Sequence, residues 1–306
     1  MIMKSRAIHK IFITAINGPL LLFLAFFLLN CTQRPDSETA KSGSMTLAVD
    51  QQLEEIAGIQ SETFSRYYPE AGITLMPSTP VKSLKYLLEG KVHAALISGE
   101  PEALEDSLFA QLKRPIRREP VARDAIVCIV NRNNPAIKLS IKELGALFST
   151  RGEKGATPLV TTDDFRLLSL LAAKTGKKRT ELHPWACSSD AELIDRVSAD
   201  NKAVGMLFRS SLDKVLTLAL KQGKRYNDIR IVPVAQESAS AEACLPTQQN
   251  IYEGRYPLVA TVYYVYYSGE ALAAGFGSWL GSGGQKAFER SSLAPFRLVE
   301  RTIILK

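Results

Sequence analysis

The stretch ARDAIVCIVNRNNP, from Ala122 to Pro135, and the stretch NIYEGRYPLVATVYYVYYSG, from Asn250 to Gly269, decide the fold. Each contains a run of apolar, β-branched and aromatic residues, with charged residues on one side and Asn, Pro or Gly on the other. This pattern is typical of a buried strand. A separate pattern of strands and helices lies between the two runs. The sequence therefore predicts a chain that leaves one lobe, builds a second lobe and returns to the first.

Strand and helix patterns alternate along the rest of the chain. Before the first run, we expect strands at 46–49, 73–76 and 92–97, with helices at 51–68 and 80–88. After it, we expect helices at 141–148, 164–174 and 189–198, and strands at 158–161, 203–208 and 229–233. The chain returns by a strand at 256–267 and ends in helices at 271–280 and 284–291. Alternating strands and helices favour an α/β fold with a mostly parallel open sheet in each lobe and a two-strand hinge.

The N-terminus resembles a lipoprotein signal. Its basic residues are Lys4, Arg6 and Lys10. The apolar core at 20–29 is too short for a membrane span of about 20 apolar residues and suits the h-region of a signal peptide. The following LLNC resembles the lipobox of bacterial lipoproteins, although Asn30 stands where a small residue is usual. We therefore expect a signal peptide at 1–30 and a lipid-modified Cys31, on the periplasmic or cell-surface side of a membrane. An uncleaved N-terminal anchor is the alternative.

The residues after Cys31 divide into a tether and two lobes. The segment 31–44 is polar and contains Pro, Gly, Ser and Thr, which is typical of a flexible tether. The remaining chain is long enough for two lobes with a large buried core. We expect 45–125 and 256–306 to form the first lobe and 126–255 the second. The whole chain has a formal net charge of +7, and removal of Lys4, Arg6 and Lys10 with the signal peptide leaves +4. That charge is mild, and no basic tract points to nucleic acid as a partner.

Residues that could perform catalysis or bind a metal are sparse. We expect His93 to be a structural side chain, and His183 lies in a loop without a nucleophile pattern. No Cys-x-x-Cys or Cys/His spacing favours a metal site, and we expect no cofactor and no enzyme. Cys128 lies in a strand pattern and is expected to be a small buried hydrophobe. Export permits a disulfide, and whether Cys187 pairs with Cys244 stays open.

Several segments occur in the order found in the phosphate-binding proteins of ABC uptake systems. They are TLAVDQQLEEIA, the turn Tyr68-Pro69, a Ser/Thr turn before a helix ending in LLEGK, RDAIVCIVN, IKELGALFS, ELIDRVSADNKAVGMLF and NIYEGRYPL. The chain resembles this branch of the periplasmic binding-protein superfamily across nearly all of 45–295. The resemblance implies a two-lobe protein with a ligand cleft between the lobes. It also implies phosphate or a similar oxyanion as the ligand and an ABC permease as the partner. We expect a monomer.

The resemblance implies ligand residues in the first lobe. In the family, backbone N–H groups and hydroxyls at helix N-termini hold the anion, because a helix start has unpaired donors and a partial positive charge. Ser78 and Thr79 match the family's Ser/Thr turn, and Thr79 is the expected N-cap before Pro80. The alternative is that both are only helix caps. Ser98 matches a hydroxyl position. Glu100 is the carboxylate that could accept the proton of hydrogen phosphate and so exclude sulfate.

The second lobe departs from the family pattern. Relatives carry a Gly-Ser-Gly-Thr-Arg type turn, whereas this chain has TTDDFR with no glycine. Thr161, Thr162 and Arg166 are the candidates to replace that turn, because hydroxyls and a guanidinium suit phosphate oxygens. Asp163 and Asp164 lie at the helix start and would oppose a bound anion. The alternative is that Asp163 simply caps a solvated helix.

The expected function follows from the fold and the candidate site together. We expect an extracytoplasmic solute-binding lipoprotein that captures phosphate or a similar oxyanion in an interlobe cleft for ABC-transporter uptake. Hinge closure of the two lobes would bury the anion. The alternative is an extracytoplasmic sensor or scaffold of the same fold that has lost tight anion binding, which the missing Gly-Ser-Gly-Thr turn favours.

Overall fold

The computed structural model describes residues 38–150, 155–236 and 242–298. The expected lipidation site, Cys31, and the signal peptide lie outside these residues. The strands are β1 (Gly43–Asp50), β2 (Ala71–Ser78), β3 (Ala94–Ser98), β4 (Ile116–Asn131), β5 (Leu139–Ser140), β6 (Thr157–Thr161), β7 (Trp185–Cys187), β8 (Ala203–Phe208), β9 (Ile229–Val232), β10 (Val234–Ala235), β11 (Ala243–Cys244), β12 (Val259–Tyr267) and β13 (Ala294–Pro295).

Helices connect most of these strands. They are α2 (Glu54–Tyr67), α3 (Pro80–Leu88), α4 (Ala103–Gln111), α5 (Ile141–Ser149), α6 (Phe165–Thr175), α7 (Asp190–Ala199), α8 (Arg209–Lys221), α9 (Gln248–Tyr252), α10 (Ala271–Leu280) and α11 (Gln285–Phe288), with the 3-10 turns η1 (Gln51–Leu53) and η2 (Arg179–Glu181). Every helix expected from the sequence is present. Three further helices, α4, α8 and the short α9, were not predicted.

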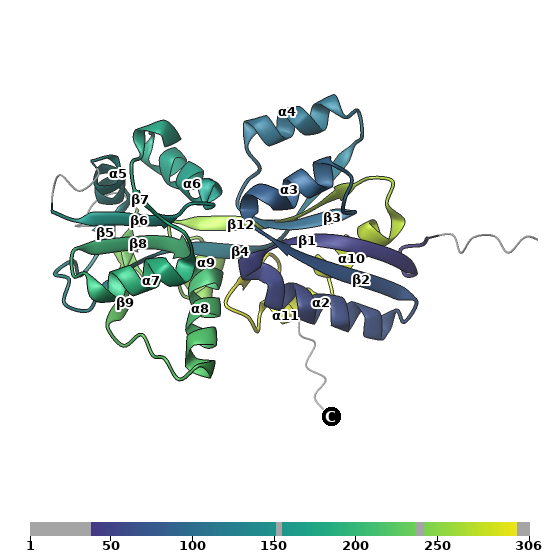
Figure 1. The fold of residues 1–306 in the computed structure, drawn as a ribbon. Helices are drawn as coiled ribbons and strands as arrows, with labels where there is room; N and C mark the ends of the chain where they lie inside the picture. The colour runs from purple at the N-terminus through teal and green to yellow at the C-terminus, as the bar shows by residue number, and fades with distance from the viewer. Residues whose placement is uncertain (1–37, 151–154, 237–241, 299–306) are drawn as a thin grey trace, which may run out of the picture. The chain divides into compact units, whose positions relative to one another are not determined.

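One large sheet of ten strands runs through the chain in the order β2-β1-β3-β12-β4-β8-β6-β7, and β9 and β13 also pair with β4 (Figure 1). The outer strands on each side are parallel, as expected. In the centre of the sheet, β12 is antiparallel to both β3 and β4, and β4 is antiparallel to β8. Two parallel halves are therefore joined by an antiparallel centre, and the α/β fold with two lobes is confirmed.

Strand β4 connects the two lobes. Its first part, up to Ala125, pairs with β12, and its second part, from Ile126, pairs with β8. The strand pattern at 125–130 predicted only the second part, because the first part carries charged residues and a proline. Both lobes belong to one compact unit that starts at Glu38.

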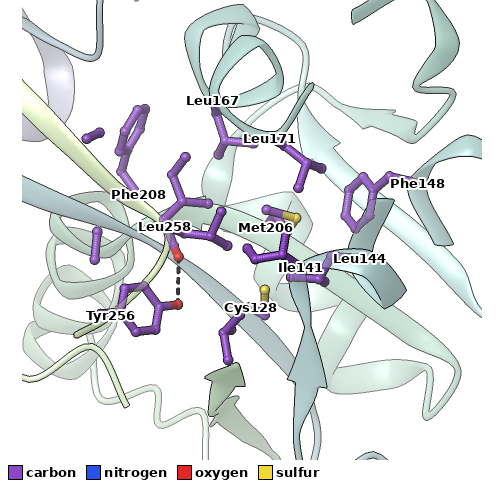
Figure 2. Packing of buried hydrophobic residues seen from close by; sticks show 14 of the residues in the cluster. Cys128, Ile141, Leu144, Phe148, Leu167, Leu171, Met206, Phe208, Tyr256 and Leu258 are labelled. Carbon is purple, nitrogen blue, oxygen red and sulfur yellow. Dashed lines mark hydrogen bonds between the residues drawn. The ribbon is translucent and has the colours of Figure 1, made fainter. Parts of the chain in front are cut away.

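Alternating side chains of the strands fill a separate core on each face of the sheet. In the first lobe, Leu47 and Val49 of β1 contact the cluster that contains α2 and α10 residues, whereas Ala48 faces the cluster of α3. In the second lobe, Cys128 faces α5 and α6, whereas Val127 faces α7 and α8. Figure 2 shows the α5–α6 cluster, in which Tyr256 also donates a hydrogen bond of 2.8 Å to the carbonyl of Ile126. Both sheet faces are thus covered, as parallel sheets require.

Candidate functional site

The carboxyl ends of three first-lobe strands meet at one edge of the sheet. The parallel register places Asp50, the last residue of β1, beside Ser78, the last residue of β2. Ser98 ends β3, the other neighbour of β1. Ligands of open α/β sheets bind at this edge, outside the carboxyl ends of the strands. The first lobe therefore presents a carboxylate and two hydroxyls at the position where a ligand site is expected.

Asp50 is fully buried and accepts hydrogen bonds from two groups of its own lobe. The Oγ of Ser83 donates to its Oδ1 at 2.6 Å, and the backbone N–H of Ser98 donates to its Oδ2 at 2.9 Å. Burial raises the pKa of Asp50 above its ordinary value, and the nearby Arg166 guanidinium and the two hydrogen bonds only partly offset that effect. The carboxyl is therefore fixed in place but remains costly to ionise.

Arg166 extends from the first turn of α6 in the second lobe to Asp50 in the first. Its side chain is 1% exposed, and its Nη1 lies 3.6 Å from Oδ2 of Asp50. Its Nη2 donates to Oε1 of Glu105 in α4 at 2.9 Å. Gly99 has a φ of +86°, and a Cβ there would lie 3.1 Å from Cβ of Arg166. The glycine that follows β3 thus permits the close approach of the two lobes.

Four buried polar atoms at this site have no hydrogen-bond partner among the described residues. They are Oγ of Ser98, Oδ2 of Asp164, and Nε and Nη1 of Arg166. Buried polar atoms in folded proteins are nearly always paired, so a cluster of unpaired ones requires an explanation. A hydroxyl, a carboxyl and two guanidinium nitrogens suit the oxygens of a small polar ligand. This cluster is the candidate ligand site.

Asp164 occupies the N-cap position of α6 but makes no side-chain cap hydrogen bond. It is 6% exposed, and burial raises the pKa of its carboxyl well above the ordinary value. The carboxylates of Asp190, Asp50 and Asp163 raise the pKa further, and Arg166 opposes them. Because desolvation and three like charges all disfavour ionisation, this carboxyl favours its protonated form.

A second set of polar contacts joins α4 of the first lobe to the second lobe. Oε1 of Glu102 accepts a hydrogen bond of 2.6 Å from Oγ of Ser169 in α6, and it lies 3.2 Å from Nη1 of Arg179 in η2. The side chain of Glu102 is 24% exposed, so these contacts lie closer to solvent than the Arg166 site. Together with the Arg166–Glu105 pair, they join α4 to α6 and η2.

The first-lobe candidates take different roles. Ser78 is buried at the sheet edge, where its Oγ donates to the carbonyl of Met76 at 3.1 Å. Thr79 is the N-cap of α3, with Pro80 as the first helical residue, as expected, although its side chain makes no cap hydrogen bond. Glu100 is exposed and accepts a hydrogen bond of 2.6 Å from Tyr263. Of the four candidates, Ser98 is the one with an unpaired buried oxygen beside Arg166.

The two threonines of the second lobe make hydrogen bonds within their own lobe. Oγ1 of Thr161 donates to Oδ1 of Asp190 at 2.7 Å, and Oγ1 of Thr162 donates to the carbonyl of Cys187 at 2.9 Å. Both hydroxyl protons are therefore already used. The structure brings Arg166 and Ser98 together, with Ser78 and Thr79 at the neighbouring strand end.

Sequence reasoning missed three of the residues that shape this site. Asp50 stands at the end of a strand pattern, and the rule that ligands bind at carboxyl ends of parallel strands could have identified it. Glu105 lies in α4, which was not predicted. Asp164 was noted only as a charge that opposes an anion, because its burial cannot be seen in the sequence.

Other expectations from the sequence can be compared with the described residues. Nδ1 of His93 accepts a hydrogen bond of 2.9 Å from the N–H of Thr46, which confirms its structural role. Cys128, Cys187 and Cys244 are free, so no disulfide joins the latter two. Within the described ranges, no cluster of His, Cys, Asp and Glu could hold a metal ion, and no helix is long and apolar enough to span a membrane.

A separate cavity of about 930 Å³ lies away from the candidate site. It is lined by residues of α2 and α8 and by the segment around α11, including Ile59, Lys214 and Trp279. The unpaired buried atoms beside Asp50 and Arg166 do not line it. The candidate site is therefore the cluster of buried polar atoms without hydrogen-bond partners, and this larger cavity is a separate feature.

A sequence model of the PBP superfamily domain matches residues 34–283, which is more than half of the chain. The chain therefore belongs to the PBP superfamily. It is 25% identical to Protein SphX of Synechococcus elongatus over 194 residues, which are 53% of this chain and 54% of that protein. The match thus spans about half the length of this curated relative.

Solved structures share the fold over most of the chain. One, from Clostridium perfringens, contains bound phosphate and is described as a phosphate ABC transporter substrate-binding protein. It has a TM-score of 0.63 and 16% identity, over 83% of this chain and 100% of that one. An ABC-type phosphate transport receptor from Vibrio cholerae has a TM-score of 0.61 and 18% identity, over 83% and 100%. The family and these neighbours are binding proteins, which confirms the resemblance and the expectation of no enzyme.

Proposed function

We propose that this chain is an extracytoplasmic solute-binding lipoprotein that holds phosphate or a similar oxyanion between its lobes and delivers it to an ABC permease. The observation that carries the proposal is Arg166, whose buried guanidinium has two nitrogens, Nε and Nη1, without a hydrogen-bond partner among the described residues. Ser98 adds an unpaired hydroxyl beside it. A guanidinium and a hydroxyl are donors suited to oxyanion oxygens.

The names of the relatives agree with this ligand class. The structures from Clostridium perfringens and Vibrio cholerae are described as a phosphate ABC transporter substrate-binding protein and an ABC-type phosphate transport receptor. For this chain we propose Ser98 and Arg166 as primary ligand residues, with Ser78 and Thr79 at the adjacent helix start. Glu100, Thr161 and Thr162 have other hydrogen-bond partners and would bind only after exchanging them.

The remaining parts of the proposal concern anchoring and motion. Lipidation of Cys31 would hold the protein at the membrane, and a tether after it would give it reach. The expected tether end at 44 is wrong, because Gly43 and Ser44 already belong to β1 and pair with β2. We propose 45–125 with 256–306 as the first lobe and 126–255 as the second. The lobes would open about β4 and β12 to admit the anion, and the protein would act as a monomer.

A second candidate function is a sensor or scaffold that does not bind an anion tightly. The observation that favours it is the pairing of Arg166 with Glu105 and Asp50, because two carboxylates already neutralise the guanidinium. An incoming anion must compete with them. The absent Gly-Ser-Gly-Thr turn removes further backbone donors from this site.

Calorimetric titration with phosphate separates the two functions. A dissociation constant in the micromolar range or below supports the solute-binding function. The Arg166→Gln variant should then bind at least about tenfold more weakly, because a hydrogen bond to a charged group contributes about 1.5–3 kcal/mol. Arg179→Gln is the matched control, since Arg179 pairs with Glu102 nearer to solvent. Absence of binding to the wild-type protein at millimolar phosphate favours the sensor or scaffold.

A further inference from the structure

The proposed function assigns no role to the carboxyl of Asp164, although this group lies at the same site. It is at the N-cap of α6, two residues before Arg166, and it is more than nine-tenths buried. An Asp at this position usually accepts a hydrogen bond from the helix backbone. Here it makes no such bond, and its Oδ2 has no partner among the described residues. The side chain is therefore placed in the site without a structural contact that explains it.

The charges around Asp164 determine its protonation. Asp50 faces it from the end of β1, Asp190 from the start of α7, and Asp163 precedes it in the chain. Arg166 is the cation that opposes them, and it is shared with Asp50 and Glu105. Burial and three neighbouring carboxylates raise its pKa further than one shared guanidinium lowers it.

A protonated carboxyl is a hydrogen-bond donor, whereas a carboxylate is only an acceptor. An acceptor in an anion site needs a proton on the ligand and so rejects a fully ionised anion. A donor has no such requirement. We propose that Asp164, as a neutral acid, donates a hydrogen bond to a fully ionised oxyanion held by Arg166 and Ser98, so that this site accepts sulfate as well as phosphate. This inference rests on the proposed function, because it concerns the same site.

The inference makes binding depend on pH in a defined direction. The anion binds the form of the protein in which Asp164 carries its proton. Above the pKa of that carboxyl, each pH unit therefore lowers anion affinity by about tenfold, because binding must take up one proton. Sulfate is the better probe, since it does not change its own protonation between about pH 5 and pH 9, whereas phosphate does.

The test is calorimetric titration of the full chain with sulfate and with phosphate across this pH range. The wild type should bind both anions and lose sulfate affinity as pH rises. Asp164→Asn keeps a neutral donor of similar shape, so it should show no pH dependence and should bind sulfate more tightly than the wild type at the alkaline end. Asp163→Asn is the matched control, because it removes the neighbouring carboxylate and leaves Asp164 in place. Its sulfate affinity should fall with pH at the same slope as that of the wild type.

Infrared spectroscopy detects directly whether the carboxyl of Asp164 is protonated. With sulfate bound near neutral pH, the wild type should show the C=O stretch of a protonated carboxyl, and Asp164→Asn should lack that band. Binding of phosphate with rejection of sulfate overturns this inference and leaves the proposed function standing. If the sulfate affinity of Asp164→Asn still falls with pH, the inference is also overturned, since the proton taken up on binding then lies on another group, for example Asp50. Absence of binding to every protein overturns both.

Discussion

Removal of the Arg166 guanidinium should destabilise the protein more than removal of any surface arginine. In Arg166→Met, the fully buried Asp50 loses the cation that lies 3.6 Å from it, and Glu105 loses its hydrogen bond of 2.9 Å. Two unit charges at this separation attract by about 5 kcal/mol at an effective dielectric constant of 20. Breaking a buried pair by removing one partner typically costs about 3–5 kcal/mol. Because Asp50 keeps its bonds from Ser83 and Ser98, we expect a loss of about 3 kcal/mol.

A double-mutant cycle that combines Arg166→Met with Asp50→Asn tests whether the loss of stability comes from the Arg166–Asp50 pair. The double variant should recover about 1–3 kcal/mol relative to the sum of the single losses, because residues of one buried network couple by that amount. Urea unfolding measures the free energy of unfolding of each variant, and a change in stability appears as a shift in the unfolding midpoint with an unchanged m-value. Arg179→Met is the matched control, since its pair with Glu102 is partly exposed and should contribute about 0–1 kcal/mol.

The pH dependence of this variant has a definite sign. Without Arg166, the folded-state pKa of Asp50 rises further above its unfolded value, because only the hydrogen bonds from Ser83 and Ser98 then offset the effect of burial. The folded state gains a proton that the unfolded state lacks, so the loss should shrink as pH falls towards the unfolded pKa. Additive single losses, or a cost for Arg166→Met no larger than that for Arg179→Met, would refute the reasoning.

Three further predictions concern other parts of the chain. Thr79→Ala should cost about 0.5 kcal/mol or less in urea unfolding, whereas Ser140→Ala should cost about 0.5–2 kcal/mol, because only Ser140 makes a side-chain cap hydrogen bond; equal losses contradict this. Burial raises the pKa of Asp124 to about 6, so the contribution of this group to stability should fall by up to about 3 kcal/mol as pH rises from about 4 to 6. Asp124→Asn should remove this pH-dependent part of the free energy of unfolding, and an unchanged pH profile in the variant contradicts the prediction. Cys31→Ser should block lipid-linked processing and shift the protein from membrane to soluble fractions, and unchanged mass and fractionation refute lipidation.

The sequence predicted the fold well because the strand and helix patterns are strong where both faces are buried. Residues 203–208 and 271–280 have the bounds that were expected, since their apolar runs end at clear breaks. Helix α4 was missed because its apolar residues lie around the whole helix, with only Phe109 buried. Helix α8 was missed because it follows β8 directly, with no cap residue between the two elements.

The candidate site was predicted only in part. Ser98 and Arg166 were identified by resemblance and by the chemistry of their side chains. Asp50 and Glu105 were not, because their importance depends on the approach of elements from different lobes. Burial raises the pKa of Asp164, which the sequence presents only as a charge that opposes an anion, and no local pattern of residues reports that burial. Thr161 and Thr162 matched the required chemistry but have other hydrogen-bond partners.

The position of a bound oxyanion tests the central claim most directly. Arsenate has the shape and charge of phosphate, and its arsenic atom can be located by anomalous X-ray scattering in crystals grown with it. The account predicts one arsenic peak between the lobes, with arsenate oxygens in hydrogen-bond contact with the guanidinium of Arg166 and the hydroxyl of Ser98. No peak at saturating arsenate, or a peak only at another position such as the cavity beside α2 and α8, would contradict it.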